Sequence, residues 1–353
     1  MRSRLPGAVG RLRRLSLVAA ATAALTITAA CGAEQPSPVT VSDDWDEVVA
    51  AAEREGSVHL YSTQHPDNLQ KLKAAFESAY PGITLEFTRG TDVEINPRVE
   101  AENRTGRGIA DVHMSSDFAW ITRAADSGEY SVEPVGPDFD APAYERARSV
   151  IDDRFFLVSG AAFALGWNTQ ALPDGLDRPG DLLDESLRGR IGVVNPQGFA
   201  PVVDEYRFFD ENWAHDFTER LAALRPRIYP GALAVAQALN SGEIVATPMV
   251  PPLVREQESG APVGWKLPQP YWGTPWYSHV LASAPHPNAA QVLADFLVTR
   301  DGQIALSKGY ASALPDIPGA VARAQDIPLP DVDTLTSESI DRYQQEWHQK
   351  FVS

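Results

Sequence analysis

Apolar and polar positions along the chain follow two different periods. Short apolar runs between turn residues predict strands at 57–62, 83–90, 110–116, 189–196, 244–250 and 277–285. Apolar positions three and four residues apart predict helices at 45–56, 68–82, 94–106, 119–129, 213–226, 232–243 and 337–351, and a pair of helices at 288–309. Strands that alternate with helices favour a mostly parallel sheet covered by helices. The sequence therefore predicts an α/β fold.

One apolar segment departs from this alternation. Residues 154–168, RFFLVSGAAFALGWN, form a long strand-like run with glycines inside it. A run of this length can pass from one domain to another, and a second alternating series follows it. The chain is also long enough for two domains of ordinary size.

The first residues have the composition of a secretory leader. Residues 1–30 carry five arginines and no acid, and an apolar stretch at 15–27 is too short for a stable membrane span. Thr28-Ala29-Ala30-Cys31 follows, and small residues before a cysteine resemble the lipobox of bacterial lipoproteins. We expect a signal peptide at 1–30, lipidation of Cys31, and a tether at 31–42 that holds the protein at the outer face of the cell membrane. An ordinary cleavage site with an incidental cysteine is the alternative.

The chain is strongly acidic. Its formal net charge is −17, and it becomes −22 once the five arginines of the leader are removed. No basic patch stands out, which argues against nucleic acid as a partner. The acidity by itself indicates solubility at a cell surface. Cys31 is the only cysteine in the sequence, so no disulfide forms within the chain.

Candidate binding residues follow the predicted strands. In open α/β sheets, ligands bind beyond the carboxyl ends of the strands. The residues predicted there are Gln64, His65, Arg89, Ser115, Ser116 and Asp117. His65 has three open interpretations: a ligand of the solute, a general base, or a helix-capping residue in an exposed loop. Arg89 is either a partner for a carboxylate or phosphonate, or a surface arginine.

Aromatic side chains are frequent near the predicted loops. Such side chains with a few polar groups are typical of small-molecule pockets. The candidates are Trp120, Phe199, Tyr271, Trp272 and Tyr277, with Gln197 and Gly198 as backbone donors if a helix starts there. Trp120 has a second interpretation, as a core residue of an amphipathic helix.

Several stretches together resemble a known family. They are VHLYSTQH at 58–65, GIADVHMSSD at 108–117, AFALGWNT at 162–169, LRGRIGVVNPQG at 187–198, VAQALNSGEIVAT at 235–247 and SHVLASAPHPNAAQVLADFLVTRDGQ at 278–303. On these residues the chain resembles the bacterial extracellular solute-binding proteins of ABC importers, and in particular their ferric-iron-binding group. The resemblance covers about residues 45–350.

The resemblance implies the type II periplasmic-binding-protein fold, with two α/β domains joined by hinge strands. Domain 1 is expected at 43–160 plus 279–315, domain 2 at 161–278, and a helical tail at 316–353. The implied function is capture of a small organic solute between the domains for delivery to an ABC permease. An anionic solute is one form of this expectation. A monomer without a cofactor is expected. A sensor subunit that presents its closed form to another protein remains open.

The residues argue against iron as the solute. In the iron-binding relatives two adjacent tyrosines of the second domain bind the metal, and this chain has Pro251-Pro252-Leu253 in the matching place. Prolines cannot bind a metal, so no metal site is expected, although His65 matches the relatives' histidine. A secreted enzyme is the remaining alternative, but the sequence contains no G-x-S-x-G, H-E-x-x-H or phosphate-loop motif. We therefore expect no catalytic residues.

Overall fold

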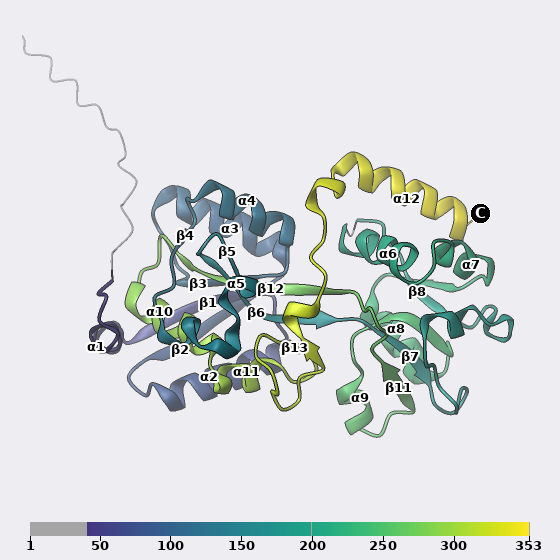
Figure 1. Cartoon of the computed structure of the whole chain (residues 1–353), viewed down its shortest axis with the longest axis horizontal. Helices are drawn as coiled ribbons and strands as arrows, with labels where there is room; N and C mark the ends of the chain where they lie inside the picture. The colour runs from purple at the N-terminus through teal and green to yellow at the C-terminus, as the bar shows by residue number, and fades with distance from the viewer. Residues whose placement is uncertain (1–40, 199, 353) are drawn as a thin grey trace, which may run out of the picture. The chain divides into compact units, whose positions relative to one another are not determined.

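The computed structural model describes residues 41–198 and 200–352 (Figure 1). The predicted signal peptide, Cys31 and most of the tether lie outside these residues, and so does Phe199. Buried apolar side chains form two separate cores. The first is built from residues between 48 and 162 and between 271 and 327, and the second from residues between 165 and 272 together with Trp347. We call the elements around each core the first lobe and the second lobe.

The first lobe contains a nine-stranded sheet. Its strands are β1 (Ser57–Ser62), β2 (Thr84–Arg89), β3 (Val112–Ser115), β4 (Ser131–Val132), β5 (Val150–Ile151), β6 (Phe155–Ala162), β12 (Gly273–Leu281), β13 (Ala311–Ser312) and β14 (Ala322–Arg323). The order is β14-β13-β6-β12-β3-β1-β2, with β4 beside β12 and β5 beside β6. Strands β1, β2 and β3 are parallel, so their carboxyl ends lie at one edge. Strand β12 returns antiparallel to both β3 and β6.

Helices cover both faces of this sheet. They are α1 (Trp45–Glu55), α2 (Pro66–Ala79), α3 (Asp92–Thr105), α4 (Phe118–Ser127), α5 (Arg146–Ser149), α10 (Pro287–Val298) and α11 (Arg300–Leu306). Helix α2 buries Leu69, Leu72 and Phe76, which is the spacing of one helical face. Helices α3 and α4 lie on one face of the sheet, and α2 and α11 lie on the other (Figure 1).

The second lobe has two smaller sheets. Strands β10 (Ala246–Val250), β7 (Ala164–Asn168) and β11 (Val263–Lys266) pair antiparallel, and β8 (Gly192–Val194) pairs in parallel with β9 (Arg227–Tyr229). The helices are α6 (Ala200–Asn212), α7 (Phe217–Ala223), α8 (Ala232–Ser241) and α9 (Val254–Glu258). Short 3-10 helices occur at Pro137–Asp140, Pro142–Tyr144, Pro179–Leu183, Glu185–Leu187, Ala324–Asp326 and Val332–Thr334.

The end of the chain connects the two lobes. Ile327 is buried in the first core, and residues 328–336, which we call the strap, lead from there to α12 (Ser337–Phe351). Helix α12 lies beside α6 of the second lobe (Figure 1). Trp347 is 2% exposed and belongs to the second core. The last helix is therefore packed onto the second lobe by its apolar face.

The predicted α/β class is confirmed, but several element boundaries were wrong. The apolar run 154–168 is two strands separated at Phe163, and residues 273–276, predicted as loop, begin β12. The helix predicted at 213–226 is only α7, and α6 before it was not predicted. Pro201 suggests a break in the sequence, yet proline is tolerated in the first turn of a helix. The boundaries of the two domains stay predictions.

None of the helices in the described residues is both long and apolar enough to cross a bilayer.

Candidate functional site

A cavity of about 430 Å³ lies among elements of both lobes. The start of α3, the loop from β3 into α4, the start of α6, the first residues of β12 and the strap all contribute to its wall. The lining residues are Thr91, Asp92, Val93, Ser116, Asp117, Phe118, Ala119, Gly198, Ala200, Pro201, Asp204, Trp272, Gly273, Thr274, Pro275, Pro330, Val332 and Leu335. We call it the interlobe cavity. Its volume suits a small molecule.

The first-lobe wall is fixed by carboxylates at two helix starts. Asp92 accepts hydrogen bonds from the hydroxyl groups of Ser115 and Ser116, each at 2.6 Å. Asp117 caps α4, because its Oδ1 accepts the backbone N–H of Trp120 at 3.0 Å. Its Oδ2 accepts the side-chain amide of Asn96 at 3.3 Å. The ends of β2 and β3 are thereby tied to each other.

The second-lobe wall comes from α6. Asp204 lies one turn inside this helix and accepts the indole N–H of Trp272 at 2.7 Å through its Oδ2. Burial raises the pKa of Asp204 from its usual range. Because Trp272 directly precedes β12, this hydrogen bond connects α6 to the strand that returns to the first lobe. The contact therefore lies at the junction of the two lobes.

The strap supplies an apolar side of the cavity through Pro330, Val332 and Leu335. It is held on α6 by Arg207, whose guanidinium donates to the backbone oxygen of Thr334 at 3.0 Å and to the hydroxyl of Ser339 at 2.7 Å. The strap is thus anchored on the second lobe while it faces the first-lobe helix starts.

The C-terminal helix also supports the loop before α6. Gln344 of α12 donates from its side-chain amide to the backbone oxygen of Pro196 at 2.8 Å, and the Gln197 amide donates to the Gln344 oxygen at 3.2 Å. Gly198, which follows, lines the cavity. Helix α12 therefore braces one wall of the site from behind.

A family comparison agrees with this geometry. The family model described as "Bacterial extracellular solute-binding protein" matches residues 65–310, more than half of the 353-residue chain. The chain belongs to this family. The strap and α12 lie beyond the matched residues of this solute-binding protein. No curated protein is significantly similar to it.

Solved structures share the fold of this solute-binding protein. Iron-bound HitA from Pseudomonas aeruginosa is 20% identical with a TM-score of 0.64, covering 82% of this chain and 99% of HitA. The substrate-binding protein of an ABC transporter from Agrobacterium tumefaciens is 16% identical with a TM-score of 0.66, covering 86% and 97%. AfuA from Actinobacillus pleuropneumoniae, solved with fructose-6-phosphate, is 18% identical with a TM-score of 0.61, covering 84% and 99%. The predicted resemblance to this group is confirmed at the level of the fold.

Four of the predicted binding residues line the interlobe cavity of the solute-binding protein. They are Ser116, Asp117, Gly198 and Trp272. Ser115 lies directly behind them, buried and bonded to Asp92. Gln197 is held by the α12 contact and by the side chain of Asn195. Their roles in binding stay predictions.

Other predicted residues are placed in the core or away from this cavity. Trp120 is 3% exposed and donates its indole N–H to Glu100 at 2.8 Å, which matches the core interpretation. Gln64 is buried, and its amide donates to the hydroxyl of Ser159 at 3.4 Å. Tyr277 is buried in β12, and Arg89 is exposed at the end of β2. None of these four side chains belongs to the cavity lining.

His65 takes the helix-capping position among its three interpretations. It is the N-cap of α2, and its Nδ1 accepts the backbone N–H of Asp67 at 3.2 Å. Burial, with Arg255 as a further cause, lowers the pKa of the imidazole, so the neutral ring that can cap is favoured. His65 is not part of the cavity lining. A contact with the solute remains a prediction for this residue.

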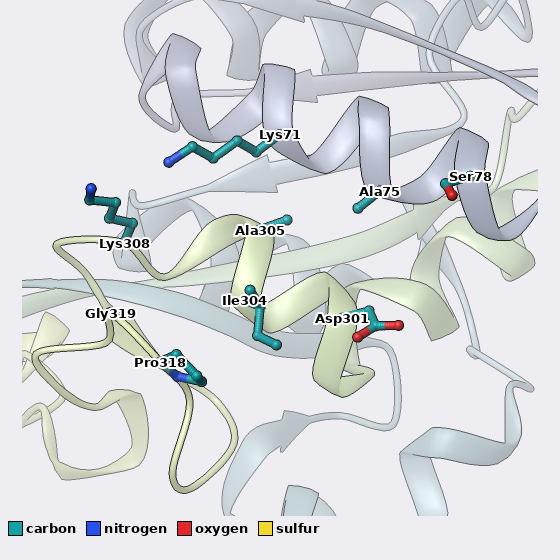
Figure 2. Close-up of a pocket in the computed structure, with 9 residues that line it drawn as sticks. All are labelled: Lys71, Ala75, Ser78, Asp301, Ile304, Ala305, Lys308, Pro318 and Gly319. Atoms are coloured by element: carbon teal, nitrogen blue, oxygen red, sulfur yellow. The ribbon is translucent and has the colours of Figure 1, made fainter.

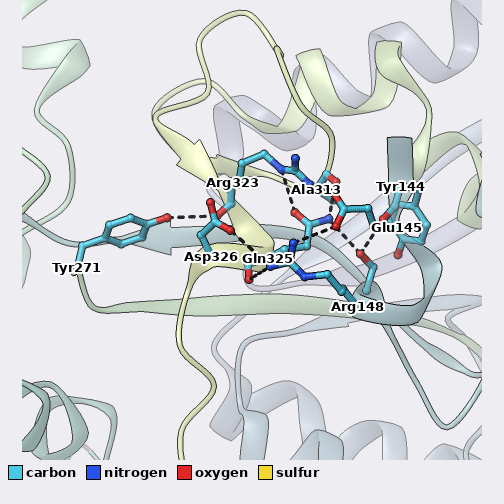
Figure 3. A network of polar contacts seen from close by, with 9 residues as sticks. Tyr144, Glu145, Arg148, Tyr271, Ala313, Arg323, Gln325 and Asp326 are labelled. Carbon is cyan, nitrogen blue, oxygen red and sulfur yellow. Dashed lines mark hydrogen bonds and ion pairs between the residues drawn. The ribbon is translucent and has the colours of Figure 1, made fainter. Parts of the chain in front are cut away.

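Tyr271 belongs to a polar network on the first lobe (Figure 3). Its hydroxyl donates to the backbone oxygen of Arg323 at 3.3 Å, and Arg323 in turn binds Glu145 at 2.7 Å. Gln325 donates to the backbone oxygen of Ala313 at 2.7 Å. These contacts fix the segment that precedes the strap, which gives Tyr271 a structural role.

A larger groove of about 580 Å³ lies between α2 and α11 (Figure 2). Lys71 and Lys308 lie near one end and Asp301 near the other. All of its lining residues come from the first lobe, and none is a predicted binding residue. A solute in this groove would not contact both lobes.

The sequence analysis missed several residues of the interlobe cavity. Asp92 and Phe118 were not named as binding residues, although they lie in segments 90–94 and 115–120, which the strand-end rule places at the ligand site. Asp204 was missed because α6 was not predicted. The strap carries no motif, and its place in the cavity follows from tertiary structure alone.

The side chains that line the cavity bear on whether ferric iron can bind there. No tyrosine and no histidine occurs among the described residues that line it. Within residues 41–198 and 200–352, no group of three or more His, Cys, Asp and Glu side chains is arranged to hold a metal ion. Asp92 and Asp117 offer hard oxygen donors, but their oxygens already accept hydrogen bonds from neighbouring groups.

Proposed function

We propose that this protein is the solute receptor of an ABC importer, which captures a small organic molecule in the interlobe cavity and presents it to a membrane permease. One observation carries the proposal: residues of the first lobe, the second lobe and β12 line a single cavity of about 430 Å³. A solute that contacts both lobes stabilises one arrangement of them, and a permease can recognise that arrangement.

Two structural relatives support the transport role. The Agrobacterium tumefaciens structure is described as the substrate-binding protein of an ABC transporter, and AfuA as a periplasmic binding protein. Lipid attachment at Cys31 is part of the proposal, because a receptor at the outer face of the membrane stays close to its permease. The motif Thr28-Ala29-Ala30-Cys31 supports it.

The test begins with a thermal-shift screen of the chain without its leader against organic cations, organic anions, sugars and metal salts. A solute at 100 times its dissociation constant stabilises the protein by about 2.7 kcal/mol. Hits are then measured by calorimetry on Ala119→Trp, which places an indole on the cavity wall. Ala74→Trp, on the exposed side of α2, is the matched control.

We expect Ala119→Trp to abolish binding and Ala74→Trp to retain it, with both variants folded. Equal affinity in the two variants would place the solute elsewhere. A screen without any hit would remove the basis for a receptor function. A stoichiometric coloured ferric complex would favour iron, as in HitA, over an organic solute.

A further inference from the structure

Three carboxylates line the interlobe cavity, and each lies at or near the start of a different helix. Asp92 is the first residue of α3, Asp117 caps α4, and Asp204 lies in the second turn of α6. The described residues that line the cavity include no lysine, arginine or histidine. The wall of the cavity therefore carries negative charge and no positive side chain.

The hydrogen bonds of these carboxylates leave their charge uncompensated. Asp92 accepts from two serine hydroxyls, Asp117 from a backbone N–H and an amide, and Asp204 from an indole. All of these donors are neutral. Within the described residues, no ion pair under 4 Å joins any of the three to a basic side chain.

Asp204 has the most open carboxylate of the three. Its Oδ2 accepts the Trp272 indole, and its Oδ1 has no hydrogen-bond partner within the described residues. This side chain is only half-buried, and it lines the cavity. The oxygen is thus available to a donor on the solute.

The helix starts oppose this charge but do not cancel it. The N-terminus of a helix is equivalent to roughly +0.5 elementary charge. The positive charge of three N-termini is therefore about half as large as the negative charge of three ionised carboxylates. One backbone donor at each of two starts is also used internally. The backbone N–H of Thr91 donates to Glu94 at 2.9 Å, and the backbone N–H of Trp120 donates to Asp117. An anion in the cavity would face three like charges.

Apart from Thr91, Ser116 and Thr274, the remaining wall is apolar and partly aromatic. Phe118 and Trp272 line the cavity together with Pro201, Pro275, Pro330, Val332 and Leu335. Aromatic faces attract cations, and the attraction is stronger where water is excluded. Apolar side chains favour a hydrocarbon body on the same molecule.

From this wall we propose that the solute is an organic cation, a protonated amine or quaternary ammonium compound, whose charged group lies between Asp204, Asp92 and Asp117. The inference rests on the proposed receptor function, and it keeps the expected organic solute but takes it as a cation and not as an anion. The aromatic and strap side chains would contact its hydrocarbon part.

The experiment compares probes of different charge, and one pair of them has the same shape. Choline and its uncharged carbon isostere, dimethylbutanol, form one pair, putrescine is a primary diamine, and citrate and phenylphosphonate are the anions. We expect at least one cation to bind, to bind at least tenfold more tightly than the neutral and anionic probes, and to lose affinity as salt is added.

Two variants locate the charge. Asp204→Asn keeps an acceptor for the Trp272 indole and removes the charge, and we expect it to weaken cation binding by about tenfold to a hundredfold. Glu219→Gln removes one charge from the exposed side of α7, outside the cavity, and affinity should stay within about twofold.

Each outcome decides the matter. If a neutral solute or an anion binds best and is lost in Ala119→Trp, the receptor function stands and the cation inference is wrong. If a cation binds equally well to Asp204→Asn and to Glu219→Gln, the carboxylate is not its partner and the inference is also wrong. If no probe and no other solute binds, both the inference and the receptor function fail.

Discussion

Trp347 of α12 gives a direct measure of how strongly the last helix is held on the second lobe. Its side chain is 2% exposed and stacks on Phe351 with ring centroids 4.5 Å apart and an angle of 11° between the planes. The ring centroid of Tyr206 of α6 lies 5.8 Å from that of Trp347. The substitution Trp347→Ala removes the buried apolar side chain of α12 that belongs to the second core.

The expected loss of stability follows from two opposing terms. Truncation of a buried tryptophan to alanine typically costs about 3–5 kcal/mol. The indole N–H of Trp347 is buried with no hydrogen-bond partner in the described residues. Removal of this unpaired N–H should therefore raise the free energy of unfolding by roughly 1 kcal/mol, which is the lower end of the usual cost of a buried unsatisfied group. We expect a net loss of about 2–4 kcal/mol in the free energy of unfolding.

The assay is urea unfolding followed by far-UV circular dichroism and by the fluorescence of the remaining tryptophans, so that coincident transitions confirm a common unfolding event. Trp347→Phe is the control, because it keeps an aromatic ring against Phe351 and deletes the unpaired N–H. It should stay within about 1 kcal/mol of the parent. A loss under about 1 kcal/mol in Trp347→Ala, or equal losses in both variants, would refute the packing argument.

Three further predictions concern other parts of the chain. Burial raises the pKa of Asp295 to about 7, and the folded state therefore holds a proton that the unfolded state releases near pH 4. The free energy of unfolding should fall, on the order of a few kcal/mol, as pH rises from 4 to 7. In Asp295→Asn, urea titrations should show that the free energy of unfolding depends less on pH. If the free energy of unfolding of the parent protein rises with pH over this range, the predicted direction is wrong. His65→Ala should cost about 0.5–2 kcal/mol of stability through the lost cap of α2, measured by thermal unfolding. A threefold or larger loss of solute affinity in that variant would instead place the imidazole on the solute. Cys31→Ala should move the protein from the membrane fraction to the soluble fraction of cells, and unchanged membrane association would rule out the lipid anchor.

Local features of the sequence were sufficient for much of the first lobe. The strand predicted at 57–62 is β1, and the helix predicted at 68–82 corresponds to α2 at 66–79. Both segments have a clean period of apolar positions, because one face is buried against a single core. The strand-end rule also pointed to Ser116 and Asp117, since parallel strands end at one edge of the sheet.

The prediction failed where the local signal was weak or ambiguous. Helix α6 begins with Ala200-Pro201, and a proline so close to the start suggests a turn. The segment 273–276 contains Gly273 and Pro275, which suggest a loop, yet it pairs with β6 as part of β12. Pairing with β6 outweighed local propensity at 273–276, and at α6 the proline is tolerated because it lies in the first turn.

The sequence by itself determined the α/β class, the order of most elements and the family, because these depend on apolar periodicity and on short local motifs. Only the tertiary structure decided which polar residues share a cavity. Asp92, Asp204 and Leu335 are far apart in the chain and carry no common motif, and they meet because α3, α6 and the strap converge beside β12. The sign of charge in the cavity is a sum over these distant residues. Their distances are set by packing of the two cores and of α12, and no local pattern in the sequence encodes them.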